Sequence, residues 1–422
     1  MSRRAALAIV VTAAMVPRLL VVAIERDTLL AGLTEKSDRF ARTLVASGTY
    51  GFLPGRPSAY TQPLYGFFLA GIYWVAGRDW LWIALAQVVL ATVTALLVYA
   101  IGSRIASRRA GVVAAVLSTL HPYLVWHDVH VNREVLDGTL AAGLTLAVLV
   151  AAEKRTLRYV ALAGAVAGLA ALANSRLLLL PLALAVFVAW DIRPPGRAVL
   201  AAVVLVGVTA VVISPWVARN RVSVGCYALT TDSRALWKAN NLNTYGILAA
   251  GKWLDQVPEL TGGPPWPELA ADLTLSGKVT TVDECAQMRL YGREVKAFWR
   301  EHPGEKLKLA AQAVPMLWGP IVTVEPDTPQ TGLGGMMRRV VEPVFMVALY
   351  ALALLGLLRL PRRFLALTVL LLAYGTLMAM IFAGTVRYRV PWDFLLCLPA
   401  AMALTEWRSV LATLRRKEGA SA

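Results

Sequence analysis

The sequence predicts an all-α, polytopic membrane protein with about ten transmembrane helices, and two observations support this prediction. Of its 422 residues, 58% are hydrophobic and only 16% are charged, and the mean hydropathy is +0.59. The hydrophobic residues are grouped in apolar segments, most of them long enough to cross a bilayer core of about 30 Å. A soluble globular protein of this length has a more polar composition and lacks such segments.

The first apolar segment follows Ser2-Arg3-Arg4 and suits a bilayer core better than the short apolar region of a cleavable signal peptide, so we expect a retained span. The predicted spans are residues 5–24, 80–101, 111–126, 133–152, 157–173, 176–190, 198–216, 340–358, 364–384 and 389–406. Two more apolar segments, 63–77 and 309–323, are predicted to be interfacial or partly embedded helices. Counting both of them as crossings is the main alternative topology.

The net charge of +16 first suggests an acidic partner such as nucleic acid. The positive residues, however, form short tracts between apolar segments, as in the cytoplasmic loops of membrane proteins. These tracts are Arg104/Arg108/Arg109, Lys154/Arg155/Arg158, Arg193/Arg197, Arg359/Arg362/Arg363 and Arg415/Arg416/Lys417. With both termini in the cytoplasm, all of them fall inside, so nucleic acid binding is not predicted.

The polar regions divide the chain into three predicted parts. Residues 1–216 form a membrane module whose first loop, 25–79, faces outward. Residues 217–339 form an outer cap with an interfacial helix, and residues 340–422 form the last membrane helices and a cytoplasmic tail.

Within the cap, Thr281 and Glu284 have the spacing of a capping box at a helix start. Cys226 and Cys285 lie in the same region, where a disulfide would form if the cap is extracytoplasmic. Their separation along the chain does not reveal their distance in space, so the pairing stays open.

Candidate chemistry begins in the first loop. Asp38 precedes a short amphipathic segment, and two interpretations apply to it. It either caps the start of a helix, or it is a general base whose pKa is raised by partial desolvation at the membrane surface. Glu35 is the alternative base.

The predicted outer turn between the third and fourth spans contains a second group of polar residues. Glu134 lies here, on the same predicted side as Asp38. His127, Asp128 and His130 are potential metal ligands, but a site would need a further fixed ligand that the sequence does not identify. No metal is therefore predicted.

A third cluster, Arg387-Tyr388-Arg389, lies at the outer end of the last pair of predicted spans. Arginines are disfavoured on that side, which indicates a bound anion, and guanidinium groups bind phosphate through paired hydrogen bonds. The alternative is that these side chains extend to the lipid headgroups.

Together these motifs resemble a known family. They are Asp38 with the trailing Tyr50, the run from Tyr60 to Tyr65, His121-Pro122 leading to Glu134, Pro215-Trp216 with Arg219-Asn220 and the later Asn240-Asn241, and Arg387-Tyr388-Arg389-Val390-Pro391. In order and spacing they resemble the C-type (GT-C) membrane glycosyltransferases, in particular the group of protein O-mannosyltransferases and lipid A aminoarabinose transferases. One departure is that the acidic pair frequent in the first loop of the mannosyltransferases is replaced here by Ser37-Asp38-Arg39.

The resemblance implies an inverting transfer of a sugar from a polyprenyl-phosphate donor to an acceptor hydroxyl at the extracytoplasmic face of the plasma (inner) membrane of a bacterium. Asp38 would be the base and Glu134 would orient a substrate. The implied contacts to the donor phosphate are Arg387, Arg389 and Arg219, and those to the substrates are Tyr60, Tyr65, Tyr388, His127 and Asn240. The implied partners are the lipid-linked donor, a glycan, lipid or protein acceptor, and membrane lipids, with no required cofactor.

Two other functions fit the same composition. A flippase or transporter for lipid-linked sugars would carry charged residues near the bilayer midplane, in broken helices. The acids and arginines here gather at one face, which favours an enzyme at the membrane surface. A glycan ligase or polymerase of another membrane fold shares the donor chemistry and remains an alternative.

Overall fold

The computed structural model describes residues 1–30, 35–192, 194–278, 280–320 and 335–406. These residues form helices joined by loops, and none of them belongs to a named strand, so the predicted all-α class is confirmed. The predicted tract Arg415/Arg416/Lys417, like Arg193, lies outside the described residues.

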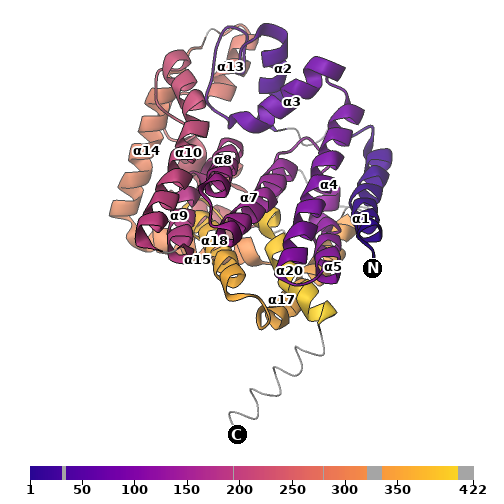
Figure 1. Cartoon of the computed structure of the whole chain (residues 1–422). Helices are drawn as coiled ribbons and strands as arrows, with labels where there is room; N and C mark the ends of the chain where they lie inside the picture. Colours follow the sequence, from indigo (N-terminus) through magenta and orange to yellow (C-terminus); the bar gives the residue numbers. More distant parts are fainter. Residues whose placement is uncertain (31–34, 193, 279, 321–334, 407–422) are drawn as a thin grey trace.

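The α-helices pack as a bundle in which α2, α3 and α13 lie together at one end (Figure 1). Their bounds are α1 Arg3–Glu25, α2 Lys36–Ser47, α3 Pro63–Ala76, α4 Trp80–Ile105, α5 Arg108–Thr119, α6 Pro122–His127, α7 Glu134–Lys154, α8 Leu157–Ala173, α9 Leu180–Asp191, α10 Pro195–Ser223, α11 Arg234–Lys238, α12 Thr244–Ala249, α13 Pro267–Leu275, α14 Glu284–Glu301, α15 Pro303–Trp318, α17 Glu342–Leu357, α18 Arg362–Ile381, α19 Val386–Arg389 and α20 Phe394–Thr405. Short 3-10 turns occur at Ser175–Leu177, Leu254–Gln256 and Val390–Trp392, and a π-helical turn, Met337–Val341, precedes α17.

Six of these helical segments are long and apolar enough to cross a membrane. They are Arg3–Glu25, Trp80–Ile105, Glu134–Lys154, Pro195–Ser223, Met337–Leu357 and Arg362–Ile381, and each coincides with a predicted span. The other four predicted spans are shorter or interrupted helices in the structure. The chain is thus a multi-pass membrane protein.

Prolines explain two of the interruptions. The predicted span 111–126 is divided into α5 and α6 at Leu120 and His121, because Pro122 disfavours helical backbone in the residue before it. The predicted span 389–406 is likewise divided, since Pro391 lies in a 3-10 turn that precedes α20.

Two predictions for helix starts are wrong. Asp38 is not an N-cap, because α2 begins at Lys36 and its N-cap is Glu35. The capping box of Thr281 and Glu284 does not form, since the N-cap of α14 is Asp283, which accepts a hydrogen bond from the N–H of Ala286 at 2.8 Å. Glu284 is therefore free for another contact.

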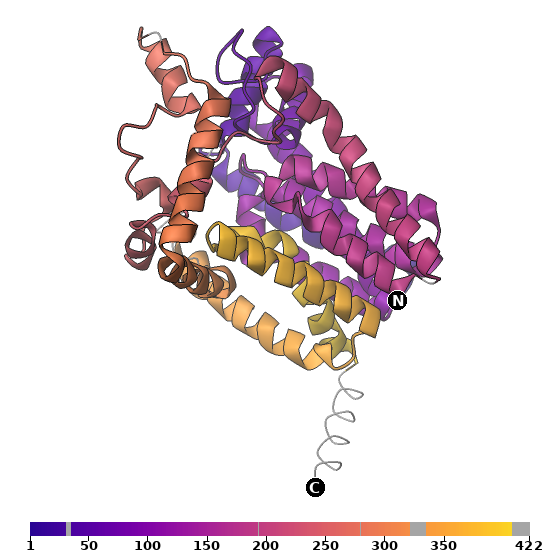
Figure 2. The same ribbon diagram turned by 90° about the vertical axis from the view of Figure 1, so that its left-hand side faces the viewer.

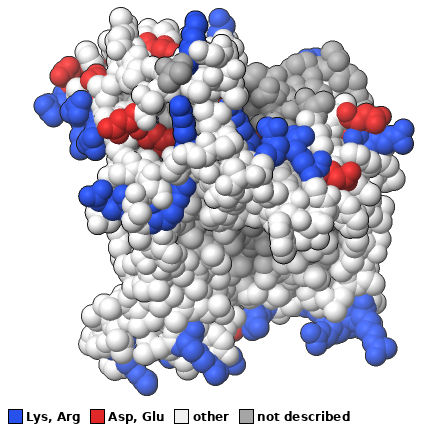
Figure 3. Space-filling model, turned by 90° about the horizontal axis from the view of Figure 1, so that it is seen from above, with Lys and Arg blue, Asp and Glu red and all other residues white. Residues whose placement is uncertain are grey.

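Among the described residues, the first basic tract predicted from charge lies near the N-terminus and near the end of α7. Arg108 donates a hydrogen bond to the carbonyl of Met1 at 3.1 Å, and Arg104 lies 3.3 Å from Glu153. On the face shown in Figure 3, charged side chains are spread over the upper half and gather again along the lower edge, and a mostly uncharged band lies between the two sets. Such a band is typical of a surface that contacts lipid.

The two predicted outer regions also lie together. The first loop contacts the cap through Arg39, which lies 2.7 Å from Asp272. The cap stands on one side of the bundle, where α14 runs along its edge (Figure 2).

Small residues bring the helices close together, as is typical of membrane bundles. A Cβ atom on Gly102 of α4 would lie 2.7 Å from Cα of Gly111 of α5. A Cβ on Gly356 of α17 would lie only 1.8 Å from the carbonyl oxygen of Pro399 in α20. The contact between α17 and α20 therefore requires glycine at position 356.

We expect Gly356→Ala to destabilise the protein by about 1–3 kcal/mol, because the added methyl group must push α20 away. Thermal unfolding in detergent would measure this loss. Gly207→Ala in α10 is the matched control, since no atom lies within 4 Å of its added Cβ. Equal unfolding temperatures for the two variants would contradict the close contact.

Candidate active site

A cavity of about 580 Å³ lies where the first loop, the cap and the ends of several membrane helices meet. The first loop contributes Glu35, Asp38 and the segment 60–62, and the cap contributes Asp232 among others. The membrane module contributes Arg133 and Arg176, and the last membrane helices contribute Arg387 and Tyr388. The predicted clusters in the first and last loops therefore share one site.

Arg387 is the centre of this site. Its guanidinium forms ion pairs with Glu35, at the start of α2, and with Glu134, at the start of α7. The side chain of Glu134 is 3% exposed and that of Glu35 is 17% exposed. Burial raises the pKa of Glu35, and neighbouring Glu134 raises it further, although Arg387 opposes the change.

Two further arginines lie beside Arg387. Nη1 of Arg133 donates a hydrogen bond to Oε1 of Gln62 at 3.1 Å. The guanidinium of Arg176 stacks on the ring of Tyr388, 3.3 Å from its centroid. Within the described part of the chain, the buried Nη1 of Arg176 has no hydrogen-bond partner. This N–H is available to an anion in the cavity.

Asp38 lines the same cavity but is strongly bonded to its neighbours. Oδ1 accepts hydrogen bonds from the hydroxyl of Tyr73 at 2.7 Å and from Nε of Arg78 at 2.8 Å. Oδ2 accepts one from Nη2 of Arg78 at 3.1 Å and lies 3.3 Å from Nε of Arg42. Both carboxylate oxygens are therefore engaged, which ties α2 to the turn before α4.

The predicted substrate contacts divide into two groups. Tyr60 and Tyr388 line the cavity, whereas Tyr65, His127 and Asn240 are not among its lining residues. Tyr65 donates to Oε1 of Gln87 at 2.6 Å, and His127 stacks on the ring of Tyr123.

Asn240 lies within the cap, in the loop between α11 and α12. Its Oδ1 accepts hydrogen bonds from Nε1 of Trp299 at 2.8 Å and from Nζ of Lys306 at 2.7 Å. Burial lowers the pKa of Lys306 to about 8. These contacts join α14 and α15 to the loop that carries Asn240.

Arg389, predicted to bind the donor phosphate with Arg387, lies in a separate cluster. Its Nε is 3.0 Å from Oδ1 of Asp393, and its Nη1 donates to the hydroxyl of Tyr350 at 2.7 Å. The side chains of Arg389 and Asp393 are each 1% exposed, so this charge is compensated inside the bundle.

Arg219 lines a second, mostly apolar groove of about 590 Å³ with Phe67 and Trp216. Its Nη1 donates to the carbonyl of Ser58 at 2.8 Å and its Nη2 to that of Tyr50 at 2.9 Å. Arg219 therefore holds the first loop against the end of α10.

The potential metal ligands of the outer turn have other partners. Oδ2 of Asp128 lies 2.6 Å from Nη2 of Arg18, and both side chains are almost fully buried. His130 bonds to the carbonyl of Trp126 at 2.8 Å. In the described ranges, no group of three or more His, Cys, Asp or Glu side chains is placed to hold a metal ion.

Two arginines that line the cavity, Arg133 and Arg176, and Arg78, which pairs with Asp38, were not predicted from the sequence. Arg176 could have been predicted in the same way as Arg387, because it also lies on the predicted outer side, where arginine is disfavoured. The pairing of Arg78 with Asp38 has no comparable signal, since it depends on how α3 turns into α4.

Comparison with known proteins bears on the predicted family resemblance. Residues 56–218 match the family model of the dolichyl-phosphate-mannose-protein mannosyltransferases. The match contains Glu134, Arg133 and Arg176, and it confirms the resemblance to GT-C glycosyltransferases. A search of curated protein sequences gives no significant match.

Solved structures support the fold. The apo oligosaccharyltransferase of Archaeoglobus fulgidus has a TM-score of 0.52 at 13% identity, covering 100% of this chain and 52% of that chain. AglB of the same organism, in complex with an inhibitory peptide and a dolichol-phosphate, has a TM-score of 0.51 at 14% identity, covering 97% and 52%. This chain thus spans about half the length of these enzymes.

A third structure, ArnT from Cupriavidus metallidurans bound to undecaprenyl phosphate, has a TM-score of 0.41 at 15% identity, covering 90% of this chain and 77% of that chain. This score is too low to establish a shared fold.

We expect Asp38→Asn to destabilise the protein by about 2 kcal/mol or more, because it removes the counter-charge of Arg78. Thermal unfolding in detergent would measure the loss. The double variant Asp38→Asn/Arg78→Met should regain part of it, since no unpaired cation remains. If Asp38→Asn unfolds like the wild type, the pair has no structural role.

Proposed function

We propose that the protein is an inverting glycosyltransferase that moves a hexosyl or pentosyl group from a polyprenyl-phosphate donor to an acceptor hydroxyl. The observation that carries the proposal is the single cavity lined by Glu35, Arg387 and Arg176, in which Arg387 pairs with Glu35 and is also held by the buried Glu134. A carboxylate and a set of arginines are the two parts that this chemistry needs, a base for the acceptor and a cationic partner for the leaving phosphate.

The geometry favours Glu35 as the base over Asp38. Asp38 shares its two oxygens among Tyr73, Arg78 and Arg42, so it has little freedom to take a proton. Glu35 faces the cavity, and burial raises its pKa, which makes it a stronger base than an exposed carboxylate.

In the proposed step, Glu35 takes the proton of the acceptor hydroxyl as that oxygen attacks the anomeric carbon of the donor. The new carbon–oxygen bond forms on the face opposite the phosphate. The bond between the anomeric carbon and the phosphate oxygen breaks, and its electron pair leaves with the phosphate. The configuration is therefore inverted. Phosphate is stable as an anion, so arginines can take the place of a general acid.

We propose Arg387 as the principal contact of the donor phosphate, assisted by Arg176. The free Nη1 of Arg176 is available to a phosphate oxygen. Because Arg387 pairs with Glu35, the phosphate would compete with Glu35 for it. Losing that pair would raise the pKa of Glu35 further, so donor binding would activate the base. Glu134 would keep Arg387 in place.

We do not assign the donor phosphate to Arg389 and Arg219, which the sequence predicted as phosphate contacts. Arg389 is neutralised by Asp393, and Arg219 lies in the separate groove. Of the predicted substrate contacts, we retain Tyr60 and Tyr388, which line the cavity.

We propose that the cavity faces the extracytoplasmic side of the plasma membrane. Cys226 and Cys285 form a disulfide in the cap, and structural disulfides persist mainly in oxidising compartments. The first basic tract, near the N-terminus and the end of α7, supports the same orientation.

We propose a lipid-linked sugar as the donor and a molecule with a hydroxyl group as the acceptor. One archaeal structure with a similar fold contains a dolichol-phosphate and a peptide, which supports a lipid-linked donor here as well. The acceptor is a glycan, a lipid or a protein.

We expect Glu35→Gln to lower kcat by about 100-fold or more, because an amide cannot accept the proton. Asp38→Asn should lower kcat much less at temperatures where it stays folded. The measurement is sugar transfer and donor hydrolysis by purified protein with a panel of polyprenyl-phosphate sugars, and Arg300→Ala, exposed on α14, is the control.

The opposite ranking of the two variants would assign the base to Asp38. In the same assay, Arg387→Ala should raise the KM for the donor. Specific donor binding without turnover, for every sugar tested, would instead support a flippase or transporter.

The pH dependence gives a separate test. The base works only when deprotonated, so kcat/KM should fall as the pH drops through the pKa of Glu35. Because that pKa is raised, the fall should lie at higher pH than the ordinary glutamate value of about 4.3. The residual activity of Glu35→Gln should lack this fall. A wild-type profile that stays flat down to pH 4.3 would contradict the assignment.

A further inference from the structure

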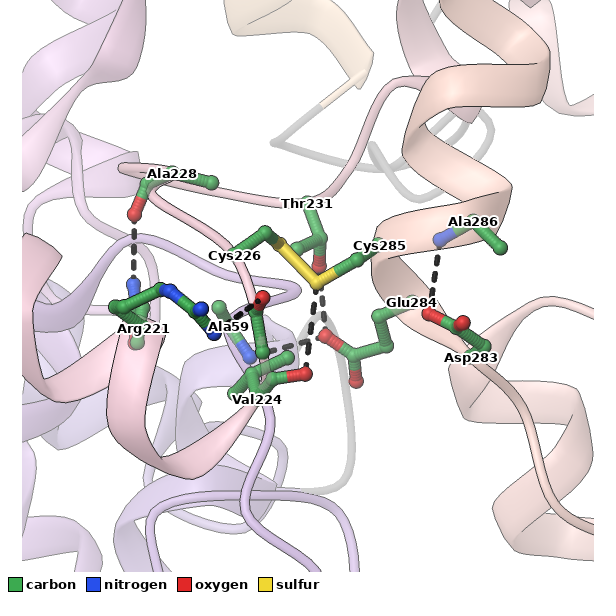
Figure 4. Close-up of a disulfide and its surroundings, with 12 residues drawn as sticks. Ala59, Arg221, Val224, Cys226, Ala228, Thr231, Asp283, Glu284, Cys285 and Ala286 are labelled. Carbon is green, nitrogen blue, oxygen red and sulfur yellow. Dashed lines mark hydrogen bonds between the residues drawn. A yellow bond between two sulfur atoms is a disulfide. The ribbon is translucent and has the colours of Figure 1, made fainter.

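The first loop is tied to the cap next to the disulfide (Figure 4). Cys226 follows α10, and Cys285 is the second residue of α14. Beside it, Oε2 of Glu284 accepts hydrogen bonds from the backbone N–H of Ala59 at 3.0 Å and from Oγ1 of Thr231 at 2.7 Å. Glu284 is 9% exposed, and the proposed transfer step makes no use of it.

The same piece of the first loop has further partners. The N–H of Thr231 donates to the carbonyl of Ala59 at 2.9 Å, and Oγ1 of Thr230 donates to the carbonyl of Tyr60 at 3.0 Å. With the bond from Arg219 to Ser58, these contacts hold the backbone of residues 58–60 on several sides. Glu284 supplies the charged acceptor among them, which forms stronger hydrogen bonds than a neutral one.

The held segment leads directly into the cavity wall. Tyr60, Thr61 and Gln62 line the cavity. Gln62 accepts a hydrogen bond from Arg133 at 3.1 Å, and its Nε2 donates to Oγ of Ser175 at 2.9 Å, next to Arg176. The backbone position at Ala59 thus sets where Gln62 meets the turns that carry two arginines of the site.

We propose that Glu284 is a positioning residue for the donor site, and that the Cys226–Cys285 disulfide fixes the start of α14 so that Glu284 can hold Ala59. This proposal rests on the proposed transfer reaction. Glu284 touches no reacting atom and acts through residues 58–62. Since Asp283 already caps α14, the contact of Glu284 with Ala59 is separate from the stability of the helix start.

The direct test is amide hydrogen exchange of the full-length protein in detergent. In Glu284→Ala, exchange at Ala59 should become about tenfold faster or more, because the N–H loses a charged acceptor. Glu284→Gln keeps a carbonyl oxygen at this place and should restore most of the protection. Asp283→Ala is the matched control, since it removes the cap of the same helix but no contact to the first loop.

The proposal is overturned if exchange over residues 58–62 in Glu284→Ala equals that of the wild type. It is also overturned if Asp283→Ala causes the same increase. If the alanine variant fails to fold, the exchange of Glu284→Gln is compared with that of a Glu284→Leu variant, and equal protection in the two would overturn the proposal.

Kinetics provide a second readout. Glu284→Ala should raise the KM for the donor about tenfold and leave kcat within about threefold, with rescue by Glu284→Gln. A loss confined to kcat, with unchanged KM, would mean a smaller fraction of folded enzyme and would overturn the positioning role. If the wild type transfers no sugar, the proposed function fails, and hydrogen exchange alone still decides whether Glu284 holds the first loop.

The role of the disulfide is tested with Cys226→Ser/Cys285→Ser. This variant should show faster exchange over residues 58–62 as well. When Glu284→Ala is added to this variant, the total increase in exchange rate should be smaller than the product of the increases caused by each change alone. The reason is that the disulfide and Glu284 act through one contact. Effects that multiply would separate the disulfide from Glu284 and overturn that part of the proposal.

Discussion

The pairing of one arginine with two carboxylates is the interaction on which the site depends. Arg387, Glu35 and Glu134 come from the last, the first and a middle part of the chain. A buried charge is costly unless an opposite charge stands next to it, so each of the three requires the others in place. Their meeting determines how the starts of α2 and α7 and the turn before α20 are arranged, and thereby forms the cavity.

Two arginines deeper in the bundle also have an opposite charge next to them, but they do not face the cavity. Arg18 pairs with Asp128, and Arg389 pairs with Asp393, and all four side chains are almost fully buried. In each case a carboxylate compensates the arginine, and very little of either side chain is exposed. These pairs stabilise helix contacts, whereas Arg387 and Glu35 line the cavity, where the proposed donor phosphate would compete for Arg387.

The first loop is held against the membrane helices by contacts of several kinds. Asp38 bonds to Arg78 at the turn before α4, Arg219 bonds to backbone carbonyls from the end of α10, and Glu284 reaches over from the cap. The proposed transfer needs such an ordered loop, because its reacting groups must be held in position when the substrates bind.

Much of the fold followed from the sequence alone. Hydropathy gave the class and the positions of six long spans, since a segment that crosses a bilayer must hydrogen-bond its own backbone as a helix and carry mostly apolar side chains. Arginines on the wrong side of the predicted topology pointed to Arg387, and the acids of the first loop pointed to Glu35 and Asp38. These signals are local, because they depend on composition and on the side of the membrane.

Only the tertiary structure decided which partner each of these residues has. Asp38 and Glu35 are three positions apart, yet one is locked by Arg78 and Tyr73 while the other faces Arg387 across the cavity. Arg387 and Arg389 are two positions apart on one short turn and point into different clusters. The sequence likewise left the pairing of Cys226 with Cys285 undecided, and the folded cap brings the two cysteines into a disulfide. Ion pairs and disulfides between distant segments depend on three-dimensional distance, which neither spacing nor composition contains.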